Sequence, residues 1–150
     1  MSAALVVAAG IGMWSTDVEG WYRRLEKPSW QPPDWLFGAA WTTIYCFMVA
    51  SAGMAWNAAD AQQQSVLLWL IGINLILNIL WSVLFFKIHR PDWALVEVVG
   101  LWLSILFWII YTYSIHTLSA WLLAPYLLWV SVAAFLNLTI IRLNPKAHLV

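Results

Sequence analysis

The sequence predicts an all-α membrane protein: a bundle of five transmembrane helices that forms one domain over residues 1–150. Of its 150 residues, 63% are hydrophobic and only 9% are charged, which is more apolar surface than a small water-soluble domain can cover. The charged residues gather in short segments that alternate with apolar runs. The net charge is zero, which argues against a nucleic-acid partner, because such a protein needs a basic face.

The apolar runs predict helices at about residues 1–14, 35–57, 65–87, 92–114 and 119–143. A bilayer core about 30 Å thick needs roughly 20 helical residues, and the last four runs meet that need. The first run is shorter, so we expect it to start at Met1 and to cross where the bilayer thins. We expect the segment 15–34 between the first two helices to form a loop.

The positions of the basic residues predict how the helices are oriented. All seven fall between the first and second helices, or at and just beyond the ends of the third and fifth helices: Arg23, Arg24, Lys27, Lys87, Arg90, Arg142 and Lys146. Because cytoplasmic loops are enriched in Lys and Arg, we expect the N-terminus outside and the C-terminus inside.

Four single residues carry their own expectations. Asp34 and Asp92 each follow a proline, and we expect each carboxylate to cap the N-terminus of a helix. Cys46 is the only cysteine, so we expect a small buried side chain rather than a disulfide or a metal ligand. Glu97 is the charge well inside a predicted helix; reaching back to the headgroups is the favoured interpretation, and a buried functional acid is the alternative.

No metal site or protein-bound cofactor is expected. The three histidines, His89, His116 and His148, fall outside the predicted helices and have no acidic or histidine partners at the spacing of metal ligands.

Aromatic and amide side chains recur at helical spacing in three of the predicted helices. These stripes comprise Trp41, Tyr45, Met48 and Ala52; Asn74, Asn78, Trp81 and Phe85; and Tyr126, Trp129, Ala133 and Asn137. An amide in hydrocarbon must find a partner, so we expect the three asparagines to face the bundle interior. Alone, such amides serve as hydrogen bonds between helices, worth about 0.6–2 kcal/mol each. Combined with the large rings, they indicate a mostly apolar pocket for a flat hydrophobic ligand.

The segment 15–34 is unusually aromatic and rigid for a connecting loop. It contains Trp21, Tyr22 and Trp30, and Pro28, Pro32 and Pro33 lie within six residues. Prolines reduce the entropy that is lost when a loop becomes ordered. We therefore expect a structured lid over the inner mouth of the bundle, with a loop lying on anionic headgroups as the alternative.

Three motifs resemble those of the TspO/translocator protein family, also known as tryptophan-rich sensory proteins or peripheral-type benzodiazepine receptors. The first is Trp21-Tyr22-x-x-Leu25-x-Lys27-Pro28-x-Trp30-x-Pro32-Pro33, followed by Trp41. The second is Asn74-x-x-x-Asn78-x-x-Trp81-Ser82-x-x-Phe85-Phe86, and the third is Trp121-x-x-x-Pro125-Tyr126-x-x-Trp129 with Leu136-Asn137. Together they cover residues 21–142, which is most of the chain.

The resemblance implies a five-helix bundle, commonly a homodimer, with a pocket closed by the first loop. Family members bind porphyrins such as protoporphyrin IX, haem, isoquinoline carboxamides and, in animals, cholesterol. Carried over by position, the ligand-binding residues are Tyr22, Pro28, Trp30, Trp41, Tyr45, Asn78, Trp81, Tyr126 and Trp129. Some bacterial members are reported to promote light-dependent porphyrin breakdown, for which Trp41 and Trp129 are the candidate catalytic residues. The tyrosine of the animal cholesterol motif is missing from residues 136–142, so cholesterol is not expected as the natural ligand.

Three functions follow as hypotheses. The favoured one is a membrane receptor or carrier for tetrapyrroles or similar flat hydrophobic molecules, with a sensing, regulatory or transport role. The alternatives are a light-dependent porphyrin-degrading enzyme and a membrane assembly subunit without a small ligand. We expect a multi-pass protein of a bacterial membrane or, in a eukaryote, of the outer mitochondrial membrane.

Overall fold

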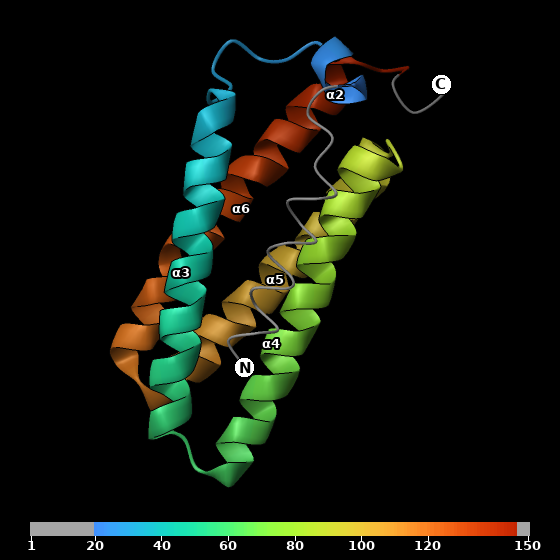
Figure 1. Ribbon diagram of the computed structural model, residues 1–150. Coiled ribbons are helices and arrows are strands. Elements are labelled where there is room, and N and C mark those ends of the chain that lie inside the picture. Colours follow the sequence, from blue (N-terminus) through green and yellow to red (C-terminus); the bar gives the residue numbers. More distant parts are fainter. Residues whose placement is uncertain (1–19, 147–150) are drawn as a thin grey trace.

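The computed structural model describes residues 20–146, and the regular elements of this part of the chain are all helices (Figure 1). Its elements are α2 (Trp21–Arg24), α3 (Asp34–Ala58), α4 (Ala61–Ser82), the π-helix η1 (Val83–Lys87), α5 (Pro91–Ile115) and α6 (Thr117–Leu143). Four stretches are long and apolar enough to cross a membrane: Asp34–Ala58, Ala61–Lys87, Pro91–Ile115 and Thr117–Leu143. The chain is therefore a multi-pass membrane protein. The helix expected at residues 1–14 lies outside the described residues.

The long helices are not packed in the order of the chain. α5 packs along both α4 and α6, and α6 packs along α3. α3 and α4 follow one another in sequence but contact each other only sparsely. The resulting order in space is α3, α6, α5, α4 (Figure 1). α4 and α6 run toward the end of the bundle that carries α2, and α3 and α5 run away from it (Figure 1).

The ends of the helices differ from expectation in a way that local chemistry explains. The residue before α3 is Pro33, and the residue before α5 is Arg90; neither makes a side-chain capping bond. The prediction that Asp34 and Asp92 are N-caps is therefore wrong. Both lie inside the first helical turn, where a carboxylate is favoured by the positive end of the helix dipole. Asp92 also pairs with Arg90, with Nη2 and Oδ2 2.6 Å apart.

The start of α4 is fixed by a capping box that the sequence analysis missed. The Gln63 backbone N–H donates to Asp60 Oδ1 at 2.8 Å, and the Asp60 N–H donates to Gln63 Oε1 at 2.9 Å. This arrangement satisfies two backbone donors at the helix end.

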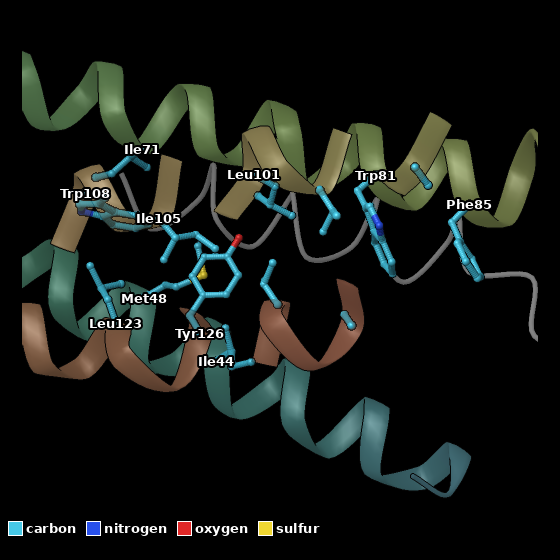
Figure 2. Close-up of a cluster of buried hydrophobic side chains, with 14 of the residues drawn as sticks. Ile44, Met48, Ile71, Trp81, Phe85, Leu101, Ile105, Trp108, Leu123 and Tyr126 are labelled. Carbon is cyan, nitrogen blue, oxygen red and sulfur yellow. The ribbon is translucent and has the colours of Figure 1, made fainter. Parts of the chain in front are cut away.

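The bundle hides a tightly packed core and turns large apolar side chains outward. Met48, Leu101, Ile105 and Trp108 are almost completely buried where the four helices meet (Figure 2). The outward faces carry many exposed apolar side chains, with Trp69 74% exposed, as expected for surfaces that contact lipid. Cys46 also lies exposed on α3, so the expectation that it is buried is wrong.

Candidate ligand-binding site

A chain of buried hydrogen bonds crosses the middle of the bundle and joins all four long helices. Tyr45 Oη donates to Asn78 Oδ1 at 3.0 Å, and Asn78 Nδ2 donates to Tyr126 Oη at 3.1 Å. Tyr126 Oη donates to Asn74 Oδ1 at 3.1 Å, and Asn74 Nδ2 donates to Ser104 Oγ at 2.9 Å. We call these five residues the polar network. Figure 2 shows Tyr126 inside the apolar cluster with its hydroxyl directed toward α4.

The three asparagines predicted to face inward do so. Asn74, Asn78 and Asn137 are 0%, 3% and 1% exposed, respectively. Asn137 is separate from the polar network and is oriented so that Nδ2 donates to the Pro91 carbonyl at 3.0 Å and Oδ1 accepts from the Leu95 N–H at 3.2 Å. Those two backbone groups are four residues apart in the first turns of α5, so Asn137 ties α6 to the start of that helix.

Two tryptophans lie about one helical turn from the polar network toward α2. Asn78 and Tyr126 are hydrogen bonded, and α4 and α6 run in the same direction (Figure 1). Trp81 and Trp129 each follow their hydrogen-bonded neighbour by three residues, which places both indoles at one level. On α3, Trp41 stacks on Tyr45 with ring centroids 5.7 Å apart.

Glu97 of α5 belongs to the same level. Asn74 and Ser104 are hydrogen bonded across the antiparallel helices α4 and α5. Trp81 lies seven residues after Asn74, and Glu97 lies seven residues before Ser104. Seven residues are about two turns, so the two side chains occupy one face at one height. We call Trp41, Trp81, Glu97 and Trp129 the upper layer.

Four polar atoms of the upper layer are buried without hydrogen-bond partners among the described residues. The unpartnered atoms are Nε1 of Trp81, Nε1 of Trp129 and both carboxylate oxygens of Glu97. The favoured interpretation of Glu97, that it reaches back to the headgroups, is therefore wrong, because neither oxygen is exposed. An unsatisfied buried polar group costs about 1–3 kcal/mol, and each one calls for an explanation such as a bound ligand or an ordered water. Nε1 of Trp108 and Oγ1 of Thr112, elsewhere in the bundle, are unpartnered as well.

Above the upper layer, the loop contacts the bundle through Tyr22. Its ring lies edge-on to Phe85 and Phe86, with centroid distances of 5.9 and 5.5 Å, and Phe85 stacks on Trp81 at 5.5 Å (Figure 2). Lys27 Nζ lies 4.4 Å from the centre of the Tyr22 ring. Burial, reinforced by the negative charge of Asp34, raises the pKa of Tyr22 to about 12.

Trp30 lies on a different surface from the other predicted site residues. It stacks on Phe135 of α6 with ring centroids 5.3 Å apart, and Phe135 is one of the exposed outward side chains. Pro28 lies half-buried in the same loop. The polar network, the upper layer and Tyr22 therefore bring together seven of the nine residues, and Pro28 and Trp30 remain in the loop that leads to α3.

Asn144 fastens this loop to the end of α6. Its Oδ1 accepts from the Glu26 N–H at 2.9 Å, and its Nδ2 donates to the Glu26 carbonyl at 2.8 Å. This paired contact with the backbone was not predicted, because the two residues are 118 positions apart. Ser104 was missed as a site residue, and Glu97 was considered only as the alternative of a buried functional acid; their spacing of seven residues, which puts two polar side chains on one face of an apolar helix, is the signal that could have found them together.

Two grooves lie on the outer surface of the bundle, away from the upper layer. One, of about 460 Å³, runs along α4 and is lined by Ser65, Leu68, Trp69, Gly72, Ile73 and Ile76. The other, of about 440 Å³, lies between α5 and α6 and includes Trp102 and Tyr113.

Comparison with known proteins places the chain in a family. Residues 1–143 match the model of the TspO/MBR family. The chain is 40% identical to protein CrtK of Rhodobacter capsulatus over 126 residues, covering 83% of this chain and 79% of that protein. It is 40% identical to the tryptophan-rich protein TspO of Chlorobaculum tepidum, covering 83% and 80%. It is 32% identical to the human translocator protein, covering 96% and 89%. Since the family model covers almost the whole chain and these relatives match it over most of their length, the chain belongs to the TspO/MBR family.

Proposed function

We propose that this protein binds a flat, hydrophobic ring system of the tetrapyrrole class, such as protoporphyrin IX or haem, among the four long helices. It would serve as a membrane receptor or carrier with a sensing, regulatory or transport role. The observation that carries this proposal is the pair of buried indole N–H groups of Trp81 and Trp129 that lack partners. A ligand that stacks on the rings and offers an acceptor would recover the free energy lost by leaving these donors unsatisfied.

The packing of the helices supports a route for such a ligand. α3 contacts α4 only sparsely, and the side-chain hydrogen bond from Tyr45 to Asn78 bridges them. Among residues 20–146, these are the contacts that a ligand entering between α3 and α4 would have to break, and they are fewer than those between α5 and α6.

The test is a titration with protoporphyrin IX in detergent, followed by the porphyrin absorbance band. Trp81→Phe and Trp129→Phe keep an aromatic ring but delete the N–H, and each should weaken binding about 5- to 50-fold, as expected for one lost hydrogen bond to a buried donor. Trp69→Phe, on the lipid-facing side of α4, is the matched control and should leave the affinity unchanged. Unaltered affinity in both upper-layer variants would discard the site.

A light-dependent enzyme that degrades the tetrapyrrole is the second candidate, favoured by the position of Trp41 beside Tyr45 and Tyr126. Its indole and that of Trp129 are the oxidisable groups that the family resemblance assigns to this chemistry. An enzyme would bleach the porphyrin band irreversibly under illumination and not in darkness, and Trp41→Phe with Trp129→Phe would slow the bleaching. A porphyrin spectrum that stays unchanged under illumination would exclude the enzyme and leave the receptor or carrier as the proposed function.

We further propose that the α2 end of the bundle faces the cytoplasm and that the protein is a homodimer. The seven Lys and Arg residues all fall in α2, the loops beside it and the ends of α4 and α6, which share one end of the bundle (Figure 1). In a Cys46→Ser background, a cysteine at Lys146 should react with an impermeant maleimide only from the cytoplasmic side, and one at Asn57 only from the opposite side.

A further inference from the structure

The starting observation is the turn between α5 and α6, which consists of His116 alone. Its extended backbone, with φ −151° and ψ 105°, ends one helix and begins the next. The His116 N–H donates to the Thr112 carbonyl at 2.8 Å, and the His116 carbonyl accepts from the Ala120 N–H at 3.3 Å. The turn lies at the end of the bundle opposite α2 (Figure 1). Because one residue forms the whole turn, a change in its side chain acts on both helices.

The imidazole of His116 caps the N-terminus of α6. The Ser119 N–H donates to Nδ1 of His116 at 3.3 Å, and the Ser119 hydroxyl donates to the His116 carbonyl at 2.7 Å. The Ser119 carbonyl accepts in turn from the hydroxyl of Ser51 on α3 at 2.7 Å. Ser51 and Ser119 are both completely buried. The cap therefore supports the first turn of α6 and a buried bond that joins this turn to α3.

This cap requires a neutral imidazole. Nδ1 accepts a hydrogen bond only when it carries no proton, and in the imidazolium both ring nitrogens are donors. A protonated His116 would also place a cation at the positive end of the α6 dipole, where positive charge is disfavoured. Both effects oppose the charged form. Histidine is the side chain that gains its proton between pH 8 and pH 5, and His116 is only half-buried, so acidification acts on the cap.

The groups around His116 do not offset this effect. α3 and α5 pack along α6, and the charged residues of these three helices all lie at the α2 end: Asp34, Asp92, Glu97 and Arg142. Asp60, at the same end of the bundle as His116, is held in the capping box of α4. Tyr111 and Tyr113, near the end of α5, carry no charge in this pH range. Within residues 20–146 the ion pair joins Arg90 to Asp92, so no carboxylate pairs with His116.

We infer that His116 is a pH-sensitive switch at the end of the bundle opposite α2. When the imidazole is neutral, the first turn of α6 is capped and is bound to α3 through Ser51. When the imidazole is protonated, the cap is lost, the first turn of α6 opens, and the bond between Ser51 and Ser119 weakens. The closed form prevails at pH 8 and is lost as the pH falls toward 5. The switch is independent of the ligand proposed above.

Amide hydrogen exchange at Ser119 measures the cap directly, because this N–H donates to His116. After correction for the intrinsic pH dependence of exchange, the protection of this amide in micelles should fall about fivefold from pH 7.5 to pH 5.0, as expected for one lost N-cap. His116→Asn keeps a good capping acceptor that does not titrate, so its Ser119 amide should be equally protected at both pH values. His116→Ala has no acceptor and should match the acidified wild type at both.

His89→Asn is the matched control, because it removes a histidine from the α2 end of the bundle. Asparagine also tolerates the left-handed backbone of this position, φ 59°. This variant should keep the wild-type response to pH. In the wild type itself, the NMR signal of the Ser119 amide should titrate with the same midpoint as the His116 imidazole.

Three results would overturn the switch. One is a wild-type Ser119 amide that is equally protected at pH 7.5 and pH 5.0, and another is an equal loss of protection in the wild type and His116→Asn. The third is a Ser119 signal that does not follow the titration of His116, which decides the matter in the wild type even if a variant does not fold. Porphyrin binding enters none of these measurements, so the proposed function is tested separately.

Discussion

At the scale of single residues, Tyr126 is the centre of the buried polar network because its hydroxyl both accepts and donates. It accepts from Asn78 Nδ2 and donates to Asn74 Oδ1, so one phenol oxygen satisfies two amides on α4. In a membrane neither amide could turn to water for a replacement partner. Tyr126, which the family resemblance assigns to the ligand-binding site, thus also links α6 to α4.

Tyr126→Phe should lower the free energy of unfolding by about 1–3 kcal/mol, because it leaves a donor on Asn78 and an acceptor on Asn74 unpaired. Equilibrium unfolding in mixed micelles measures the loss. Tyr45→Phe is the comparison: Tyr45 gives only one bond to the network, so its loss should be smaller. Equal losses would show that Tyr126 has no special place in the network.

Tyr22 makes the stability of the protein depend on pH in the alkaline range. Burial raises its pKa to about 12 in the folded protein, whereas an unfolded tyrosine titrates near 10. The folded state therefore disfavours the ionised phenol, and stability is unaffected by this group below about pH 10 and is lost as the pH rises from about 10 toward 12.

Comparing the melting temperature at pH 8 and pH 11 for the wild type and Tyr22→Phe measures this effect. The phenylalanine variant has no proton to lose at this position, so it should lose less stability on going to pH 11. An identical fall in the two proteins would contradict the assignment of the pKa shift to Tyr22.

At the scale of elements, η1 gives the loop its docking surface. In this π-helical turn, both Phe85 and Phe86 contact the ring of Tyr22, although consecutive residues of an α-helix point in directions about 100° apart. π-Helical turns inside α-helices often mark functional sites. Here the turn lets one end of a helix contact both Trp81 of the upper layer and Tyr22 of the loop.

The link between Asn144 and the loop gives a prediction about α2 and the residues around it. Asn144→Ala removes both side-chain contacts with the Glu26 backbone, so the loop should open more often and trypsin should cut after Arg23 and Arg24 several-fold faster. Gel analysis of timed digests checks this. Asn57→Ala, an exposed amide at the other end of α3, should digest like the wild type. Unchanged cleavage of the Asn144 variant would mean that the ring contacts of Trp21, Tyr22 and Trp30 hold the loop without Asn144.

At the scale of the whole molecule, an open groove on α4 offers a surface for the proposed homodimer. Gly72 lies in this groove beside Trp69 and Ile73, and small residues in such positions let membrane helices approach closely. Within residues 20–146, a side chain added at Gly72 meets no atom within 4 Å, so the groove can be filled without disturbing this part of the protomer.

Gly72→Leu should therefore weaken or abolish the dimer and leave the melting temperature of the protomer nearly unchanged. Light scattering coupled to size-exclusion chromatography in detergent measures the mass. Gly53→Leu on α3 is the control, because that position is equally open but lies outside the groove. A dimer that survives Gly72→Leu places the interface elsewhere.

The sequence alone determined the class of the protein, the positions of its long helices and the inward direction of Asn74, Asn78 and Asn137. These follow from constraints that act on each segment by itself: lipid requires about 20 apolar residues per crossing, and it penalises any amide that lacks a partner. The aromatic and amide stripes followed from the same helical spacing.

Only the tertiary structure decided which residues those amides meet and what becomes of Glu97. The long helices are apolar on every side, so hydropathy does not say which face of each turns inward. That rotation hides the carboxyl of Glu97, exposes Cys46 and stacks Trp30 on Phe135. The bond of Asn74 to Ser104 and that of Asn144 to Glu26 likewise require α5 to lie beside α4, and the end of α6 beside the loop. Partners far apart in the chain are chosen by packing, which no local pattern encodes.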